Sequence, residues 1–417
     1  MTLYKNRFNS KNQVIVVGSG VAGMMTALTC SNYTSVALIT DGKLGSSNSL
    51  MAQGGIQVPK DSDYDRSAMV DDMMKSARGL ASRERIVNFV GNINEVMDYL
   101  FDLGVNFDSE KDGKLIRRHA GGLSTPRIVS SKDKIGPTVI NALRKKVMSS
   151  KNIEIFQKCR VEEIKVNKKD GRNVFKISLR EFKKTDSKKS INQMLSFAAS
   201  TLVCATGGKT FAYAQRVGKR TTNPFNSNHK IFELLEKIGF EERNKDLYQY
   251  QPFGIVIPSK MRGKNIPETI TNFSVQIVDR NGQKVCNTKQ DRHEMVKSMN
   301  KAFKEGRAFE LLDGEWGFKL IIPKKKKEQI ISVIPKLKSL LENNFEEVYI
   351  QPVLHYYLGG FEVNESGESK IKGLFLAGEI TTGLHGANRL MGTGLMESLV
   401  GGMIAGKNAA QRVNSLN

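Results

Sequence analysis

The fold of this chain is decided by Val14-Ile15-Val16-Val17-Gly18-Ser19-Gly20-Val21-Ala22-Gly23, in which a buried-strand run breaks into the pattern G-x-G-x-x-G. A strand, a glycine turn and a helix start suit a dinucleotide pyrophosphate, because the first helical N–H groups and the positive end of the helix dipole face the anion. Gly18 makes the tight turn, Gly20 lets the backbone approach the phosphates, and Gly23 lets the helix pack close to the strand. The stretch predicts a nucleotide-binding α/β domain.

The residues that follow support this interpretation. Residues 24–31 continue as a helix, and residues 36–41 form a second strand that ends at Asp41. An acidic residue at that point is placed to meet the ribose hydroxyls of a dinucleotide. The alternative is a glycine-rich turn with a purely structural role.

Composition excludes several other classes of protein. At 417 residues the chain is long for one core, so two domains are expected. No apolar run approaches the roughly 20 residues of a membrane helix, and the N-terminus lacks the apolar segment of a signal peptide. The 4 cysteines contain no C-x-x-C pair, which argues against a disulfide framework, a zinc site or an iron–sulfur cluster. We therefore expect no metal and a cytoplasmic protein.

The net charge of +22 raises nucleic-acid binding as another function. However, the lysines gather in runs such as residues 324–327, without the interleaved aromatic residues of a base-stacking surface. A solvated lysine-rich surface explains them, so no nucleic-acid partner is expected. A basic cleft could still attract small dianionic substrates.

The pattern along the chain indicates a discontinuous nucleotide domain. Short alternating strands over residues 153–203 close in Ala205-Thr206-Gly207-Gly208, a turn that brings bare backbone close to a cofactor. Residues 241–349 read as an inserted α+β domain without such turns. A buried strand then ends at Gly378-Glu379, and a final helix opens after Gly392. The predicted boundaries are 1–240 and 350–417 for the nucleotide domain and 241–349 for the insertion.

These motifs occur in the order seen in one family. The chain resembles the succinate dehydrogenase/fumarate reductase flavoproteins in residues 18–23, in Ala52-Gln53-Gly54-Gly55-Ile56, in residues 205–208 and 378–379, and in His385-Gly386-Ala387-Asn388-Arg389-Leu390. Within the family, residues 221–224 and 382–389 are most similar to the L-aspartate oxidases. The His-Gly-Ala-Asn-Arg block is the most specific of these motifs.

The resemblance implies FAD rather than NAD. It also implies a Rossmann-like FAD-binding domain split by an inserted α+β capping domain, with the family's C-terminal helical domain absent. Asn48 stands where relatives in respiratory complexes carry the histidine that binds flavin covalently, so we expect non-covalent FAD. The cofactor-binding residues that follow are Gly18, Ser19, Gly20, Ala22, Gly23, Asp41, Ser47, Asn48, Ala52, Gln53, Gly54, Gly55, Ala205, Thr206, Gly207, Gly378, Glu379, Asn388, Arg389, Gly394 and Leu395.

The resemblance also assigns the chemistry. A dicarboxylate buried beside an apolar ring system needs fixed cations, and Arg389 and His355 occupy the family positions that hold the substrate carboxylates. Arg292 matches the arginine that moves the substrate proton, and Glu268 the acidic residue near it. Arginine is a poor base in water, so this role needs a partner. The alternatives are structural roles for His355 and Glu268 and a surface or cap role for Arg292.

Several positions depart from the family pattern, among them Thr393-Gly394-Leu395 in place of an Asn-Ser-Leu stretch after the arginine block. Gln251 and Phe253 replace a histidine and a threonine, and Ala120 replaces an acidic residue of the aspartate oxidases that faces the substrate amino group. Gln251 remains a candidate substrate ligand. His385 could contact the substrate or lie behind the residues that do.

The function implied is oxidation of L-aspartate to iminosuccinate, with hydride transfer to flavin N5, for quinolinate and NAD synthesis. Oxygen, fumarate or a quinone would reoxidise the flavin, and quinolinate synthase is a possible partner. The departures leave two alternatives open. One is a soluble fumarate reductase or other dicarboxylate oxidoreductase, and the other is a non-catalytic FAD-binding subunit.

Overall fold

The structure is a computed structural model that describes residues 5–6, 13–132, 134–184, 190–224, 229–343 and 347–415. Its strands are β1 (Lys5–Asn6), β2 (Gln13–Val17), β3 (Ser35–Ile39), β4 (Ile56–Gln57), β5 (Ile128–Val129), β6 (Ile153–Phe156), β7 (Cys159–Lys169), β8 (Arg172–Lys184), β9 (Ser190–Ala199), β10 (Thr201–Cys204), β11 (Tyr248–Ile257), β12 (Gln276–Val278), β13 (Phe309–Glu310), β14 (Trp316–Ile321), β15 (Tyr349–Tyr357) and β16 (Leu374–Leu376).

Its α-helices are α1 (Val21–Ser31), α2 (Asp63–Ala77), α3 (Arg83–Gly91), α4 (Ile93–Asp102), α5 (Ile135–Ser149), α6 (Thr210–Arg216), α7 (Lys230–Lys237), α8 (Arg292–Lys304), α9 (Lys327–Val333), α10 (Lys338–Glu342) and α11 (Thr393–Asn414). Short 3-10 helices include Asn48–Met51 and Glu268–Phe273.

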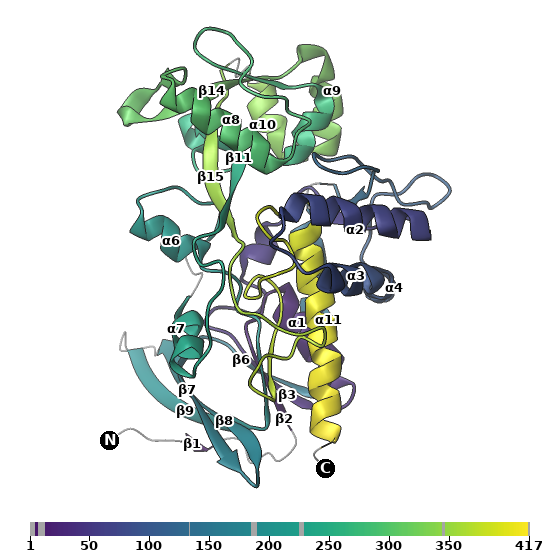
Figure 1. Ribbon diagram of the computed structural model, residues 1–417, viewed down its shortest axis with the longest axis vertical. Helices are drawn as coiled ribbons and strands as arrows, with labels where there is room; N and C mark the ends of the chain where they lie inside the picture. The colour runs from purple at the N-terminus through teal and green to yellow at the C-terminus, as the bar shows by residue number, and fades with distance from the viewer. Residues whose placement is uncertain are drawn as a thin grey trace.

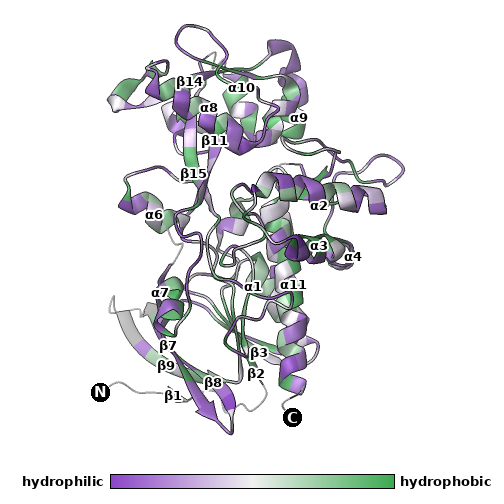
Figure 2. Cartoon of the chain, viewed as in Figure 1, coloured by the Kyte–Doolittle hydropathy of each residue, from purple (hydrophilic) through white to green (hydrophobic). Residues whose placement is uncertain are grey.

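A five-stranded parallel sheet forms the centre of the larger body, in the order β16-β10-β2-β3-β6. Successive side chains of a strand point to opposite faces of its sheet. Accordingly Val14 and Val16 pack into one hydrophobic cluster with α1, α5 and α11, whereas Ile15 and Val17 pack into another with β7, β8, β9 and α7. The sheet is thus buried on both faces, as its continuous apolar runs require, and these strands are hydrophobic in Figure 2.

The nucleotide-binding domain is discontinuous in sequence, as the sequence predicts. The strands β10 and β16 lie next to each other beside β2, although some 170 residues separate them along the chain. The last helix, α11, lies along α1 (Figure 1). A Cβ on Gly402 would lie 2.5 Å from the Ala22 carbonyl oxygen, so glycine is what permits this close helix packing.

The inserted capping domain has its own antiparallel sheet, β11-β15-β14-β12, and its own hydrophobic cluster with α8, α9 and α10. The strands β11 and β15 run from the upper body toward the lower one in Figure 1. The proposed boundary at residue 350 falls inside β15, and we retain the three segments as a proposal. Across the residues that the structure describes, no helix is long and apolar enough to cross a membrane.

Candidate active site

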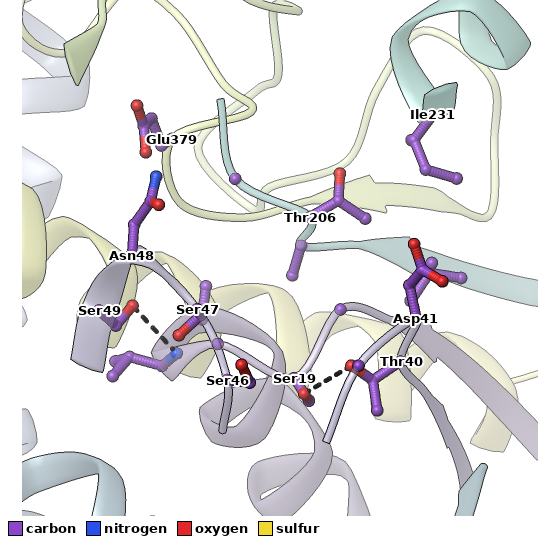
Figure 3. Close-up of a pocket in the computed structure, with 18 of the residues that line it drawn as sticks. Ser19, Thr40, Asp41, Ser46, Ser47, Asn48, Ser49, Thr206, Ile231 and Glu379 are labelled. Carbon is purple, nitrogen blue, oxygen red and sulfur yellow. Dashed lines mark hydrogen bonds between the residues drawn. The ribbon is translucent and has the colours of Figure 1, made fainter. Parts of the chain in front are cut away.

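A cavity opens at the carboxyl ends of β2, β3 and β10 (Figure 3). This edge of a parallel sheet is where α/β domains bind their ligands. The predicted cofactor residues in its lining are Gly18, Ser19, Gly20, Ala22, Asp41, Ser47, Asn48, Ala205, Thr206, Gly207 and Glu379.

The glycine turn forms the floor of this cavity. Gly18 has a φ of +109°, and a Cβ there would lie 2.2 Å from the Ala205 carbonyl oxygen. A Cβ on Gly23 would lie 1.8 Å from the Gly18 carbonyl oxygen. Among the described residues no side chain caps the start of α1 at Gly20, although the Val21 N–H reaches Ser49 Oγ at 3.4 Å. The open helix start suits a pyrophosphate, so this cradle fits a dinucleotide.

The other end of the cavity carries Asp41, directly after β3. Its carboxylate is paired with Arg160, whose Nη2 lies 3.1 Å from Asp41 Oδ2. Ser19 Oγ donates to Thr40 Oγ1 at 2.8 Å and ties the glycine turn to the end of β3, as Figure 3 shows. Asp41 therefore lines the cofactor cavity with its carboxylate held by Arg160.

A second cavity adjoins the first. The two share four lining residues, Asn48, Ser49, Glu379 and Ser398. Asn48 and Glu379 face each other at the shared boundary (Figure 3). The first turn of α11 also reaches the second cavity through Gly394 and Leu395, which places the positive end of that helix there.

Arg292 and Glu268 form a buried ion pair on the wall of the second cavity. Arg292 is the first residue of α8, after the cap residue Asp291, whose carboxylate accepts from the Glu294 N–H. Its Nε donates to Glu268 Oε2, and its Nη1 donates to Gln249 Oε1 at 3.2 Å. The Arg292 and Glu268 residues are 6% and 3% exposed, so the pair is shielded from bulk solvent and open to the cavity.

Arg389 enters the same cavity from the other domain. Its guanidinium lies 4.5 Å from the centre of the Tyr356 ring, and its Nη1 donates to the Leu390 carbonyl at 3.2 Å. Within the described part of the chain its Nε is buried without a hydrogen-bond partner. Burial, and then the charge of Arg292, lower the pKa of Arg389 to about 10, so it remains a cation at pH 7.

His355 is half-buried in the lining of this cavity. Its Nδ1 lies 2.7 Å from Thr222 Oγ1, and its carbonyl accepts from Asn223 Nδ2 at 2.8 Å. Burial, and then the positive charges of Arg292 and Arg389, hold the pKa of His355 well below its ordinary value. The ring is therefore neutral at pH 7, and with Nδ1 engaged by Thr222 its Nε2 is available to a ligand.

A chain of hydrogen bonds lies behind Arg389. Tyr356 donates to Glu397 Oε2 at 2.6 Å, and His385 Nε2 lies 3.0 Å from the same oxygen. Burial acts to raise the pKa of Glu397, but His385 and Tyr356 together bring it below its ordinary value, so Glu397 is a carboxylate. Of the two roles considered for His385, the structure places it behind the cavity.

Several predicted residues lie outside the lining of both cavities. Gly23 faces Gly18, and Gly378 packs against Ala22, where a Cβ would lie 3.0 Å from the Ala22 side chain. Gly54 packs against Met391. Asn388 is buried and bonds Ser76 and Gln249 instead of facing the cofactor cavity.

The remaining predicted residues line the second cavity. They are Ala52, Gln53, Gly55, Gln251, Glu268, Arg292, His355, Arg389, Gly394 and Leu395, together with Asn48 and Glu379 of the shared boundary. Two of the departures from the family pattern lie elsewhere. Phe253 is fully buried in the core of the capping domain, and Ala120 packs into the core of the larger body.

Four residues of the site escape prediction from the sequence. Gln249 bonds Arg292 and also donates to Asn388 Oδ1 at 2.8 Å, and its spacing of two from Gln251 on β11 could have indicated it. Thr222 and Tyr356 stand in or beside motifs that the sequence singles out. Glu397 carries no local signal, because its role depends on contacts with β15 and the His385 loop.

The geometry agrees with comparisons to known proteins. The sequence model of a protein family described as FAD binding domain matches residues 13–395. The chain belongs to this family. FAD is accordingly its cofactor, and the glycine cradle and the open start of α1 fit the pyrophosphate of that group.

The relatives of this FAD-binding protein are oxidoreductases. The chain is 27% identical to an L-aspartate oxidase from Yersinia pestis, over 96% of its own length and 75% of that protein. It is 25% identical to one component of the fumarate reductase (CoM/CoB) of Methanothermobacter marburgensis, over 96% of its length and 73% of that component. A solved structure of E. coli quinol fumarate reductase FrdA with one mutation superposes with a TM-score of 0.86, at 21% identity, covering 98% of this chain and 71% of that one. The protein is an FAD-dependent oxidoreductase.

Proposed function

We propose that this protein oxidises L-aspartate to iminosuccinate, the first step toward quinolinate and NAD. One observation carries the proposal: Arg389, His355 and the Arg292–Glu268 pair line a single cavity that shares a wall with the cofactor cavity. The similarity to L-aspartate oxidases supports the choice of substrate.

The cations and the histidine of this cavity have distinct tasks. Arg389 is charged and held in place by Tyr356, and its Nε has no hydrogen-bond partner among the described residues, so it binds a substrate carboxylate. His355 is neutral and donates to the second carboxylate from Nε2 while Thr222 holds Nδ1. Together they orient the carbon to be oxidised toward the shared wall.

The proton leaves through the buried ion pair. Oxidation removes two hydrogens, one as a proton and one with an electron pair, and bound FAD supplies the acceptor for that electron pair. Arg292 takes the substrate proton in exchange for one that it passes from Nε to Glu268, so the pair as a whole gains one proton and Arg292 stays a cation. The pair excludes bulk water from this step because both residues are buried.

Further parts of the proposal concern the cofactor and its surroundings. FAD is bound non-covalently, since Asn48 is an amide without a nucleophilic atom and its Nδ2 donates to Asn223 Oδ1 at 2.8 Å. Oxygen, fumarate or a quinone reoxidises it, and quinolinate synthase consumes the product. The protein acts in the cytoplasm.

Reduction of fumarate is the second candidate function. The relative from Methanothermobacter favours it, and the same cations would bind fumarate. In that case Arg292 delivers a proton instead of removing one.

Anaerobic mixing separates these functions. The FAD-loaded protein is mixed with L-aspartate without oxygen, and the visible absorbance of oxidised flavin is followed. The proposal predicts that the yellow absorbance is lost, and that peroxide forms when oxygen is then admitted. Unchanged absorbance with L-aspartate, together with rapid reoxidation of the chemically reduced protein by fumarate, would favour the second candidate.

A further inference from the structure

We infer that Gln251 makes this cavity selective for dicarboxylates that carry a hydrogen-bond donor on carbon 2, with the 2-amino acid as the preferred member of the class. The inference rests on the proposed function, because it concerns the same cavity. It adds a residue that distinguishes L-aspartate from succinate and fumarate.

The amide of Gln251 has a defined orientation. Gln251 lies on β11, is 2% exposed and lines the second cavity. Its Nε2 donates to the Ile266 carbonyl at 3.3 Å. A carbonyl oxygen only accepts hydrogen bonds, so this contact fixes which end of the amide is the NH₂ group.

The other end of this amide lacks a donor. Across the residues that the structure describes, Gln251 Oε1 is buried without a hydrogen-bond partner. A buried polar atom left in this state is costly and rare in folded proteins. Since Gln251 belongs to the cavity wall, a ligand can supply the missing donor.

A second polar group of the cavity wall, without a hydrogen-bond partner among the described residues, indicates which other group the ligand carries. Arg389 Nε is a buried donor that finds no acceptor in the part of the chain that the structure describes. A carboxylate satisfies Arg389, and an N–H or O–H group satisfies Gln251 Oε1. Succinate and fumarate carry only acceptors at neutral pH, so they leave the Gln251 oxygen unmet. L-aspartate carries both groups on neighbouring carbons.

The acidic residues of the wall each accept at least one hydrogen bond from the protein. Glu268 accepts from Arg292, and Glu379 Oε1 accepts from the Tyr357 N–H at 2.9 Å. Among the described residues of this wall, the buried acceptor that receives no hydrogen bond is the amide oxygen of Gln251, which meets an amino group without adding charge to the cavity. Gln251 discriminates between ligands because a ligand without a donor leaves its buried oxygen unpaired, which costs free energy. This mechanism separates substrates that differ by one hydrogen-bond donor.

Isothermal titration calorimetry on the FAD-loaded, photoreduced protein under anaerobic conditions tests this inference. The reduced flavin cannot oxidise either ligand, so the Kd values of L-aspartate and succinate are measured without turnover. Wild type should bind L-aspartate more tightly than succinate. In Gln251→Met, which keeps the length but removes the acceptor, the ratio of the two Kd values should shift toward succinate by about tenfold or more. Gln251→Leu should give the same shift.

The control is Gln351→Met, on the neighbouring strand. Gln351 is buried too, but its Nε2 donates to Glu315 Oε2 at 3.2 Å, away from the cavity. This variant should keep the wild-type ratio. A wild type that binds succinate as tightly as L-aspartate overturns the inference, as does an unchanged ratio in both Gln251 variants. Either result can occur while L-aspartate still bleaches the flavin, so the inference can fail while the proposed function stands.

Discussion

The two cavities of this protein are built in different ways. The cofactor cavity is lined by short contiguous segments that follow parallel strands, such as residues 18–22 and 205–208, and glycines let their backbone come close to one another. The substrate cavity is walled by side chains from both domains, among them Glu268, Arg292, His355 and Arg389. A lining made of closely spaced backbone requires glycine at fixed positions. A lining made of side chains from remote segments requires contacts between those segments.

This difference explains which changes the chain tolerates. The glycine turn leaves no space for a Cβ, since neighbouring backbone atoms stand in the way at Gly18 and Gly23. In the second cavity, by contrast, the resemblance to the family places a histidine where this chain has Gln251. We therefore expect substitutions to affect the two cavities differently.

A large effect on the cofactor cavity is expected from Gly23→Ala. The added Cβ meets a backbone oxygen that cannot move without displacing β2, so FAD binding should weaken by about a hundredfold or more. The FAD content of the purified protein measures this. Gly91→Ala at the end of α3, where a Cβ meets nothing within 4 Å, should leave FAD content unchanged. Equal FAD content in both variants would contradict a backbone-built cofactor cavity.

Arg292→Gln should affect the other cavity alone. Removing the group that takes the proton should slow flavin reduction by L-aspartate by about 10²–10⁴-fold, with FAD content unchanged. Stopped-flow absorbance under anaerobic conditions measures the rate. The matched control is Arg307→Gln, which breaks another ion pair of the capping domain, 2.7 Å to the buried Asp279. A loss of rate as large in the control would show that Arg292 acts only through stability.

The burial of Glu379 at the boundary between the cavities can be tested through the pH dependence of stability. Burial raises the pKa of Glu379 from 4.5 to about 7. The folded state therefore favours the protonated acid, and the stability from this group is full below pH 4.5 and lost as the pH rises through about 7. Between pH 5 and 8 the free energy of unfolding in urea should fall by up to about 3 kcal/mol more in wild type than in Glu379→Gln. Parallel pH profiles would refute this placement.

The smallest effect is expected at Tyr356. Tyr356→Leu removes the ring under Arg389, worth up to about 2 kcal/mol when desolvated, so the Kd of fumarate should rise by about tenfold or more. Tyr356→Phe keeps the ring and should have a clearly smaller effect. Calorimetric titration of the oxidised protein measures both. Equal Kd values in the two variants would show that the ring does not hold Arg389.

The extent to which sequence could predict these cavities follows from the same contrast. The local residue pattern over residues 14–23 determines the strand and the turn, so the fold class and the cofactor domain could be predicted. This includes the strand near residue 378 that completes the domain. The specific motif around Asn388 predicts that this residue faces the cofactor. Its side chain instead bonds Ser76 and Gln249 inside the protein.

The substrate cavity could be predicted only in part. The Arg292 and Glu268 pair follows from family positions, but Gln249 and Glu397 do not. Their roles arise where β11 meets α8 and where β15 meets α11, contacts that no local pattern encodes. The position of Phe253 could not be predicted either, because only the packing of the capping domain places it in the core instead of the cavity wall.

The central claim is that a dicarboxylate held by Arg389 lies against the cofactor. Titration of the oxidised, FAD-loaded protein with fumarate, which cannot be oxidised in this reaction, tests it most directly through the visible flavin spectrum. The account predicts a saturable spectral change in wild type that is lost in Arg389→Met at the same fumarate concentrations. Calorimetric binding of fumarate without any spectral change, or an undiminished change in Arg389→Met, would contradict it.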